Sequence, residues 1–221
     1  MKRRKVGNLL ALAVLATLVE GPMHRYEIAA KMRNRGKERD MDVKWGSLYT
    51  VVQNLEKHGF LEIVGSERDG ARPERTIYAL TPAGRAETED WTRELLSTPA
   101  PVHHPFVSGL SVAAIIPPDD VIALLEQRSE RLTRQIAEDR AEMDKVRGAV
   151  PRLFLVENEF TVAMLEAEVA WVDALREEIA SGAFPDVDWW RRMHAENMDP
   201  QEVAGMVERG DFTQSTETSQ Q

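Results

Sequence analysis

Apolar and polar residues follow a helical period along most of the chain, and the stretch KWGSLYTVVQNLEKHGF, residues 44–60, shows it most clearly. Its apolar residues recur at i, i+3, i+4 and i+7, the spacing of one helix face: Leu48, Val51, Val52 and Leu55. The opposite face carries hydrogen-bonding side chains and one cation: Ser47, Thr50, Gln53, Asn54 and Lys57, with Tyr49 at its border. The stretch predicts an amphipathic helix whose polar face is neutral to basic.

Two further helices are predicted before this one. The apolar run from Leu9 to Val19 predicts a buried first helix that stops at Gly21-Pro22. A cationic cluster before an apolar run is also typical of a secretory signal. This run is too short to span a bilayer, however, so we favour the buried helix. The segment MHRYEIAAKMRNRG predicts a second helix that ends at Gly36. Its expected inward positions are Met23, Tyr26, Ile28, Ala29 and Met32.

Two short strands are predicted after residues 44–60. The segments FLEIVG and RTIYAL are rich in β-branched and aromatic residues, and an Asp69-Gly70 turn separates them. The connecting loop is basic, with Arg68 and Arg72 in it and Arg75 at the start of the second strand. Thr81-Pro82 then opens a helix with Trp91 and Leu95 on one face. Three helices followed by a hairpin are typical of a winged helix-turn-helix.

The rest of the chain predicts long helices. A proline-rich segment holds a short apolar helix over residues 106–116. A helix then runs from Asp119 to Gly148, and the next covers residues 151–181. The first has apolar residues at heptad positions: Ile122, Leu125, Leu132, Ile136, Met143 and Val146, interrupted by Ser129 and Asp139. The second has Val156, Phe160, Leu165, Val169, Val172, Leu175 and Ile179. Because neither helix can bury its stripe alone, we expect them to pack on each other and on a second subunit.

Charge divides the chain in two. The net charge is −9, yet residues 1–86 hold 16 Lys and Arg against 10 Asp and Glu, which makes the amino-terminal part basic and the remainder acidic. A local basic surface favours contact with a phosphate polymer despite the acidic average. We therefore expect the polar face of residues 44–60 to enter a DNA groove. Gln and Asn there can pair with adenine, while Ser or Thr can serve any base. The expected phosphate contacts are Lys57, Arg68, Arg72, Arg75 and the amino-terminal Lys2, Arg3, Arg4 and Lys5.

Three motifs, MHRYEIAAKM, GSLYTVVQNLEKHGFL and ARPERTIYALTPAGR, resemble the PadR family of bacterial transcription regulators over about residues 9–86. The family pattern has glycine at position 25 and proline at position 50, and often a base at position 74, where this chain has Arg25, Thr50 and Glu74. The resemblance implies that the family's DNA contacts fall on Tyr26, Ser47, Tyr49, Lys57, Arg72 and Arg75. For the two tyrosines a second interpretation stays open, in which each is a core residue with its hydroxyl at the surface.

The resemblance also implies a helical carboxy-terminal dimerisation domain and control by phenolic or other aromatic compounds. We expect a small aromatic or apolar effector between the two halves, near Trp91 and Phe106. A site among Phe154, Phe160 and Trp171 is the alternative, with Trp189 and Trp190 as further aromatic residues; all of these are also ordinary core candidates.

No catalytic chemistry is evident. The sequence has no cysteine, glycine-rich phosphate loop, nucleophile elbow or zinc-protease helix. His103 and His104 are adjacent but have no further ligand at metal spacing. We expect no enzyme activity, no metal and no cofactor. The cysteine-free composition fits a cytoplasmic protein, and no membrane association is expected. A helical adaptor that binds protein instead of DNA is the alternative function, and a small-molecule hydrolase is a more distant one.

The expected fold is mostly α. Residues 1–97 form a winged helix-turn-helix, residues 98–118 a proline-rich hinge with a short helix, and residues 119–210 a helical dimerisation domain. The polar tail, residues 211–221, is predicted to be disordered. The expected function is a transcriptional regulator, a repressor that binds double-stranded DNA as a homodimer on an inverted repeat and is released by its effector.

Overall fold

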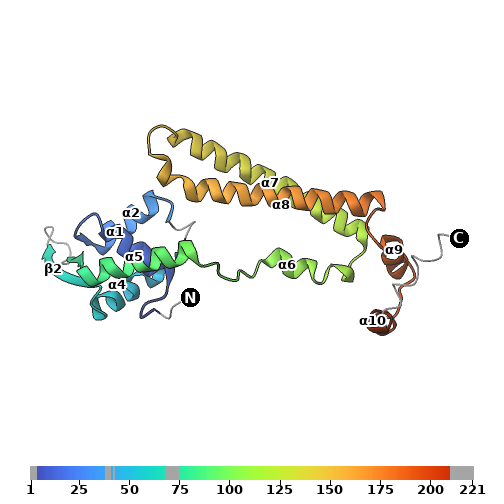
Figure 1. Cartoon of the computed structure of the whole chain (residues 1–221), viewed down its shortest axis with the longest axis horizontal. Helices are drawn as coiled ribbons and strands as arrows, with labels where there is room; N and C mark the ends of the chain where they lie inside the picture. Colours follow the sequence, from blue (N-terminus) through green and yellow to red (C-terminus); the bar gives the residue numbers. More distant parts are fainter. Residues whose placement is uncertain (1–3, 38–40, 42, 68–74, 210–221) are drawn as a thin grey trace. The chain divides into compact units, whose positions relative to one another are not determined.

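A computed structural model describes residues 4–37, 41, 43–67 and 75–209 (Figure 1). The chain forms two compact units that divide between Val102 and His103. The first joins helices to one small antiparallel sheet, and the second is helical in its described part, which confirms the predicted fold class. The proposed hinge of residues 98–118 straddles this division. In the described residues, no helix is both long and apolar enough to cross a membrane.

The described residues of the first unit include four α-helices. They are α1 (Leu9–Leu18), α2 (Arg25–Asn34), α4 (Leu48–Lys57) and α5 (Pro82–Ser97), and a 3-10 turn, Trp45–Ser47, leads into α4. The α1 helix is apolar nearly all round, as predicted, and eight of its ten residues are buried. Asn8 caps it by accepting a hydrogen bond from the Leu10 N–H at 2.8 Å. The Thr81 side chain caps α5 by accepting from the Gly84 N–H at 3.0 Å.

The sheet has three strands in the order β1-β3-β2: β1 (Met23–His24), β2 (Leu61–Glu67) and β3 (Arg75–Leu80). The predicted hairpin is β2 and β3, which pair antiparallel from Leu61 opposite Leu80. The prediction that the second helix starts at Met23 is wrong, because Met23 pairs with Tyr78 of β3 instead. His24 then caps α2, since its Nδ1 accepts a hydrogen bond from the Glu27 N–H at 3.1 Å.

The core of the first unit lies where α1, α2 and α4 meet the sheet and α5. Its fully buried large side chains are Leu10, Val14, Leu15, Leu18, Ile28, Met32, Val52, Leu55 and Trp91. Of the predicted inward positions, Met23 on β1 and Ile28, Ala29 and Met32 on α2 are buried, whereas Tyr26 is 70% exposed. Trp91 and Leu95 lie one helical turn apart on α5, which fits their prediction on one face; Trp91 is buried and Leu95 is exposed.

The second unit is built on two long antiparallel helices, α7 (Pro118–Val146) and α8 (Val156–Ser181) (Figure 1). Shorter elements are α6 (Pro105–Leu110), the 3-10 turns Ala113–Ile115 and Arg152–Phe154, α9 (Val187–Ala195) and α10 (Pro200–Arg209). The α7 helix begins one residue before the predicted Asp119, with Pro117 at the cap position. Gly182 ends α8 in a left-handed conformation with φ 81°.

The predicted seam between the long helices is mostly confirmed. On α7 the buried apolar residues are Val121, Leu125, Leu132, Ile136 and Met143, and on α8 they are Val162, Val172 and Ile179. Asp139 is also buried within the seam. Val146 is exposed, because α7 ends there and the chain turns away. On α8, Val156 and Phe160 are exposed too, so the apolar residues of this helix do not all face α7.

Candidate nucleic-acid interface

The α4 helix has the two faces that its sequence predicts. Its apolar stripe, Leu48, Val51, Val52 and Leu55, is buried in the core of the first unit. Thr50, Gln53, Asn54 and Lys57 are exposed, while Ser47 is half-buried at the cap position and makes no side-chain cap bond. At 100° per residue, Thr50, Gln53 and Lys57 lie directly opposite the buried stripe. The helix is thus anchored on one side and offers hydrogen-bonding groups on the other.

Tyr49 is held at the edge of this exposed face. The Arg25 guanidinium lies over its ring, 4.2 Å from the ring centroid. Gln53, one helical turn further along α4, donates from Nε2 to the Tyr49 hydroxyl at 2.8 Å. Tyr49 is 50% exposed, so it is not a core residue. Sequence reasoning did not place Arg25 in the site, although its departure from the family glycine was the available signal.

A second tyrosine and arginine pair joins α2 to the wing. Arg75, the first residue of β3, lies over the Tyr26 ring at 5.6 Å from its centroid. His24 meets the same ring edge-on at 6.3 Å. Because Tyr26 is largely exposed, the core interpretation fails for it as well. Arg33 makes a third such contact, 4.2 Å over Trp45 at the entrance to α4. Cation–π contacts hold each of these arginines against its aromatic ring.

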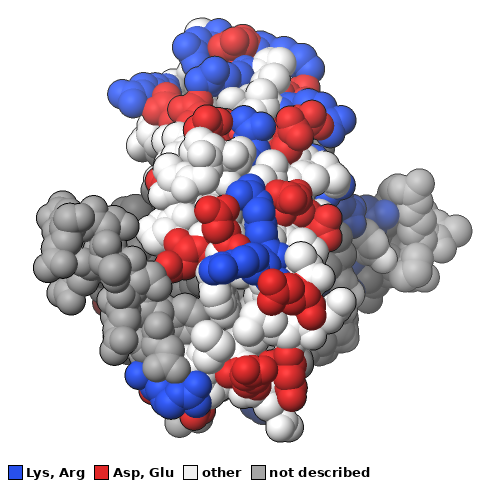
Figure 2. All heavy atoms as spheres, turned by 90° about the vertical axis from the view of Figure 1, so that its right-hand side faces the viewer, with Lys and Arg blue, Asp and Glu red and all other residues white. Residues whose placement is uncertain are grey.

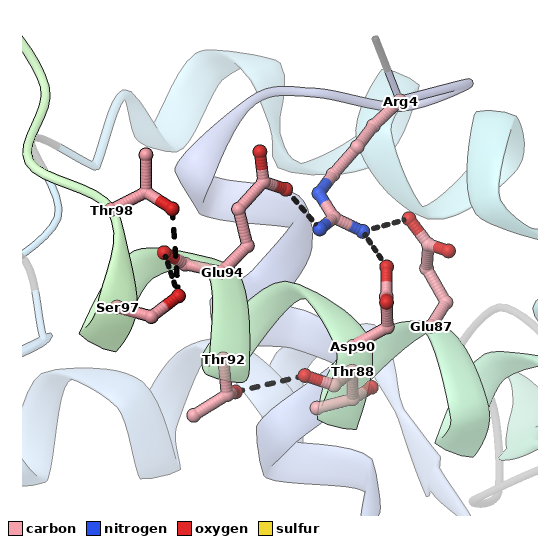
Figure 3. A network of polar contacts seen from close by, with 8 residues as sticks. All are labelled: Arg4, Glu87, Thr88, Asp90, Thr92, Glu94, Ser97 and Thr98. Atoms are coloured by element: carbon pink, nitrogen blue, oxygen red, sulfur yellow. Dashed lines mark hydrogen bonds and ion pairs between the residues drawn. The ribbon is translucent and has the colours of Figure 1, made fainter. Parts of the chain in front are cut away.

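Arg4 does not match its prediction as a phosphate contact. Its guanidinium binds three carboxylates of α5 and is directed away from solvent (Figure 3). Nη1 donates to Glu87 at 2.7 Å and to Asp90 at 3.1 Å, and Nη2 donates to Glu94. The guanidinium also lies 5.1 Å from the ring centroid of Trp91. With its side chain only 3% exposed and three anions around it, Arg4 is unavailable to DNA.

Burial lowers the pKa of Arg4, but its hydrogen bonds to Glu87, Glu94 and Asp90 outweigh that effect and raise the pKa above its usual value. The residue therefore stays charged and fastens the amino-terminal segment to α5. Lys5, the next residue, is exposed. Lys2, Arg3 and the loop residues Arg68 and Arg72 lie outside the described residues.

On the face drawn in Figure 2, acidic and basic side chains are interspersed. Among the described residues, candidate phosphate contacts of the first unit include Lys57 on the exposed face of α4, Arg25 beside Tyr49 and Arg75 beside Tyr26.

The two expected effector residues lie in different units. Trp91 is 2% exposed in the core of the first unit. Phe106 is half-buried in the second, with the Arg128 guanidinium 3.9 Å from its ring centroid and the Trp171 ring edge-on at 6.0 Å. A joint site of Trp91 and Phe106 thus remains a prediction. Of the alternative residues, Phe154, Phe160 and Trp171 are exposed, while Trp190 is partly buried and donates from Nε1 to the Ile116 carbonyl at 3.0 Å.

A cavity of about 450 Å³ opens beside Phe106, between α6 and α7. Its apolar lining includes Phe106, Leu110, Ile116, Leu125 and Leu132, and its polar lining is Gln127, Arg128, Arg131 and Gln135. Arg128 is neutralised by Glu168, to which its Nε donates at 2.6 Å. Within the described part of the chain, no acid pairs with Arg131. Over the same residues, no group of three or more His, Asp or Glu side chains is placed to hold a metal ion.

Comparison with known proteins places these features in a family. Residues 14–90 match the model of the Transcriptional regulator PadR-like family. Among solved structures, Bacillus subtilis PadR in complex with operator DNA is similar with a TM-score of 0.65 and 17% identity, over 76% of this chain and 97% of that one. The same protein in complex with p-coumaric acid gives 0.60 and 16%, over 80% and 97%.

The Vibrio cholerae virulence activator AphA is similar with a TM-score of 0.58 and 15% identity, over 78% of this chain and 98% of that one. A comparison with curated proteins found no match. At these identities the solved structures establish the fold, and the family model identifies its amino-terminal part. The matched residues 14–90 contain the anchored α4 helix, both exposed tyrosines and the wing strands. The chain therefore carries a transcriptional regulator domain of the PadR-like family.

Proposed function

We propose that the chain is a sequence-specific DNA-binding transcriptional regulator that reads the major groove with α4. The observation that carries this proposal is the exposed face of Thr50, Gln53, Asn54 and Lys57, held rigid by the buried stripe behind it. An α-helix fits the major groove, where amide side chains distinguish base pairs and a lysine neutralises phosphate. The similar Bacillus subtilis structure, which was solved with operator DNA, supports the same use of this fold.

The chain acts as a homodimer in this proposal. The α8 helix has a second apolar stripe on the side opposite α7: Val156, Phe160, Met164, Ala167 and Trp171, of which the four larger residues are among the exposed hydrophobics of the structure. Phe160, Met164 and Trp171 follow heptad spacing. A stripe of this size is costly to leave in water, and a second copy of the same helix would cover it. A dimer would also present two α4 helices to the half-sites of an inverted repeat.

We assign effector binding to the cavity beside Phe106. Its apolar wall suits an aromatic ring, and the Arg131 guanidinium suits a carboxylate, so the ligand class is a small aromatic acid. The solved complex of Bacillus subtilis PadR with p-coumaric acid supports this class. Ligand titrations followed by tryptophan fluorescence test the assignment. Replacing Arg131 with Ala should weaken binding, while Trp91→Phe should leave it unchanged; the reverse result would favour the site near Trp91.

Repression is the simplest mode for such a dimer, because a protein bound at a promoter excludes other proteins until its effector releases it. The similar protein AphA is named an activator, however, so the sign needs its own test. A reporter gene placed behind the operator should become more active when the protein is absent. A fall in expression would make the protein an activator.

Selection from random duplex DNA by the full-length protein tests the proposed function itself. A regulator should enrich an inverted repeat, and its affinity should fall as salt rises. Lys57→Ala should reduce the slope of log K against log salt by about one. The matched control is Lys145→Ala, which removes a lysine of α7 paired with Glu142. A chain that enriches no sequence and binds no duplex would favour the helical adaptor.

A further inference from the structure

We propose that Tyr49 and Arg25 determine which base Gln53 reads, by fixing the orientation of the Gln53 amide. This inference rests on the proposed function, because it concerns the same α4 face. Gln53 has one carbonyl and two N–H groups at its end. One N–H is already used, since Nε2 donates to the Tyr49 hydroxyl at 2.8 Å. The exposed side chain therefore keeps one acceptor and one donor for DNA.

One acceptor and one donor match adenine. In the major groove, adenine offers the N6 amino group as donor and N7 as acceptor, whereas guanine offers two acceptors, N7 and O6. With its amide held as it is, Gln53 can accept from N6 and donate to N7. The reversed amide, which would accept from the Tyr49 hydroxyl, would have both N–H groups free and would match guanine. The hydrogen bond from Gln53 to Tyr49 thus makes Gln53 favour adenine over guanine.

The DNA backbone keeps the hydroxyl in its accepting role. In the part of the chain that the structure describes, the Tyr49 hydroxyl proton has no acceptor, and the side chain is half exposed. A phosphate oxygen of bound DNA can accept a hydrogen bond from the Tyr49 hydroxyl, and the neighbouring Arg25 cation attracts the same phosphate. Because the O–H group then donates to phosphate, the hydroxyl oxygen can only accept a hydrogen bond from Gln53. The contact of Tyr49 with a DNA phosphate thereby gives Gln53 a preference for adenine.

Arg25 is the positioning residue of the three. It begins α2, and its guanidinium lies 4.2 Å from the Tyr49 ring centroid on α4, so it fixes the tyrosine ring from a different helix. A residue without a side chain at position 25 could not make that contact. The adenine preference accordingly depends on Arg25.

Paired affinity measurements on the full-length protein test the inference. The probes are the selected operator and a copy with guanine in place of the adenine whose recognition is lost in Gln53→Ala. Any loss of phosphate contact weakens binding to both probes equally and therefore cancels in the ratio of the two affinities. Tyr49→Phe, which keeps the ring and loses the hydroxyl, should lower this ratio by about fivefold or more, the lower range of a bidentate base contact. In a Gln53→Ala background the same change should leave the ratio as it is.

Two further variants separate positioning from general binding. Arg25→Ala should lower the ratio, and Arg25→Lys, which keeps a cation over the ring, should restore part of it. Tyr78→Phe is the matched control, because it removes a hydroxyl from the buried tyrosine of β3 in the core of the same unit; it should leave the ratio unchanged. If wild-type protein prefers a sequence but the ratio is the same in Tyr49→Phe, this inference is overturned while the proposed function stands. If wild-type protein prefers no sequence, the proposed function itself fails.

Discussion

Gly84 of α5 lies directly against the backbone carbonyl of Phe60: a Cβ at position 84 would lie 2.1 Å from that oxygen. The same carbonyl accepts a hydrogen bond from the Thr81 N–H at 3.1 Å, and Thr81 in turn caps α5. The α4 helix ends at Lys57, and Gly59, with φ 76°, leads the chain into Phe60. The end of α4 and the start of α5 are therefore fixed to each other through backbone contacts.

Replacing Gly84 with Ala should destabilise the protein by about 1–3 kcal/mol, the usual cost of overpacking, because backbone rather than a flexible side chain has to move. Thermal unfolding measures the change. Gly46→Ala is the control, since a Cβ there meets nothing within 4 Å and the φ angle is ordinary. Equal unfolding temperatures for wild type and Gly84→Ala would show that Gly84 does not lie against the Phe60 carbonyl.

Replacing Arg4 with Met should also destabilise the first unit, by about 1–3 kcal/mol. The change removes the guanidinium that Glu87, Asp90 and Glu94 bind. The loss stays below that of a fully buried pair because the carboxylates partly reach water. Arg93→Met removes another arginine near the same helix, from an exposed pair with Glu89, and should cost no more than about 0.5 kcal/mol. Similar small losses for both variants would mean that Arg4 does not fasten the amino-terminal segment.

Acid should weaken the junction of α1 and α2 through Glu20. Hydrogen bonds from Arg35 and from Lys31 lower the pKa of Glu20 from 4.5 to about 2, against the effect of burial. A depressed folded-state pKa means that the stabilisation is complete above pH 4.5 and is lost as the pH falls toward 2. All three side chains reach solvent, so the contribution is less than about 1 kcal/mol.

Denaturant titrations at pH 6 and pH 3 measure this contribution. Glu20→Gln should be less stable than wild type at pH 6 and closer to it at pH 3. Glu89→Gln, which breaks an exposed pair within α5, should show a smaller change of this kind. A difference between wild type and Glu20→Gln that is the same at both pH values would contradict the pairing.

Replacing Phe160 with Asp should convert the proposed dimer to monomers, because a carboxylate on the second stripe of α8 cannot be covered by an apolar partner. The protomer should still fold, since Phe160 is exposed in the single chain. Sedimentation gives the mass. Thr161→Asp is the control: it adds the same charge one residue away, on an exposed position off the stripe. A dimer mass for Phe160→Asp would place the interface elsewhere.

Short-range patterns of the sequence were enough to predict α4 and the long helices. The stripe of Leu48, Val51, Val52 and Leu55 is buried as predicted. Apolar residues that recur with a period of 3.6 share one face of a helix, and that face packs against the core. The same reasoning missed β1. Two residues have no period, and Met23 and His24 are extended only because Tyr78 and Ile77 of β3 lie beside them.

Long-range contacts account for the other differences. Arg4 looked like one of four amino-terminal bases, and its partners lie more than 80 residues away, although Glu87, Asp90 and Glu94 at i, i+3 and i+7 form an acidic face that was visible in the sequence. The contact of Arg25 with Tyr49 joins two helices and has no local pattern. On α8, one apolar set turned out to be two stripes, because counting apolar positions does not say how many faces they occupy.

The affinity of Asn54→Ala for operator and for scrambled DNA shows whether the exposed face of α4 reads base sequence. Asn54→Ala should lose roughly 1–3 kcal/mol on the operator and little on scrambled DNA, because an amide that pairs with a base contributes only where that base is present. Lys57→Ala should weaken binding to both. An equal loss on the two DNAs for Asn54→Ala, or a wild-type protein that binds them equally, would show that α4 does not read base sequence.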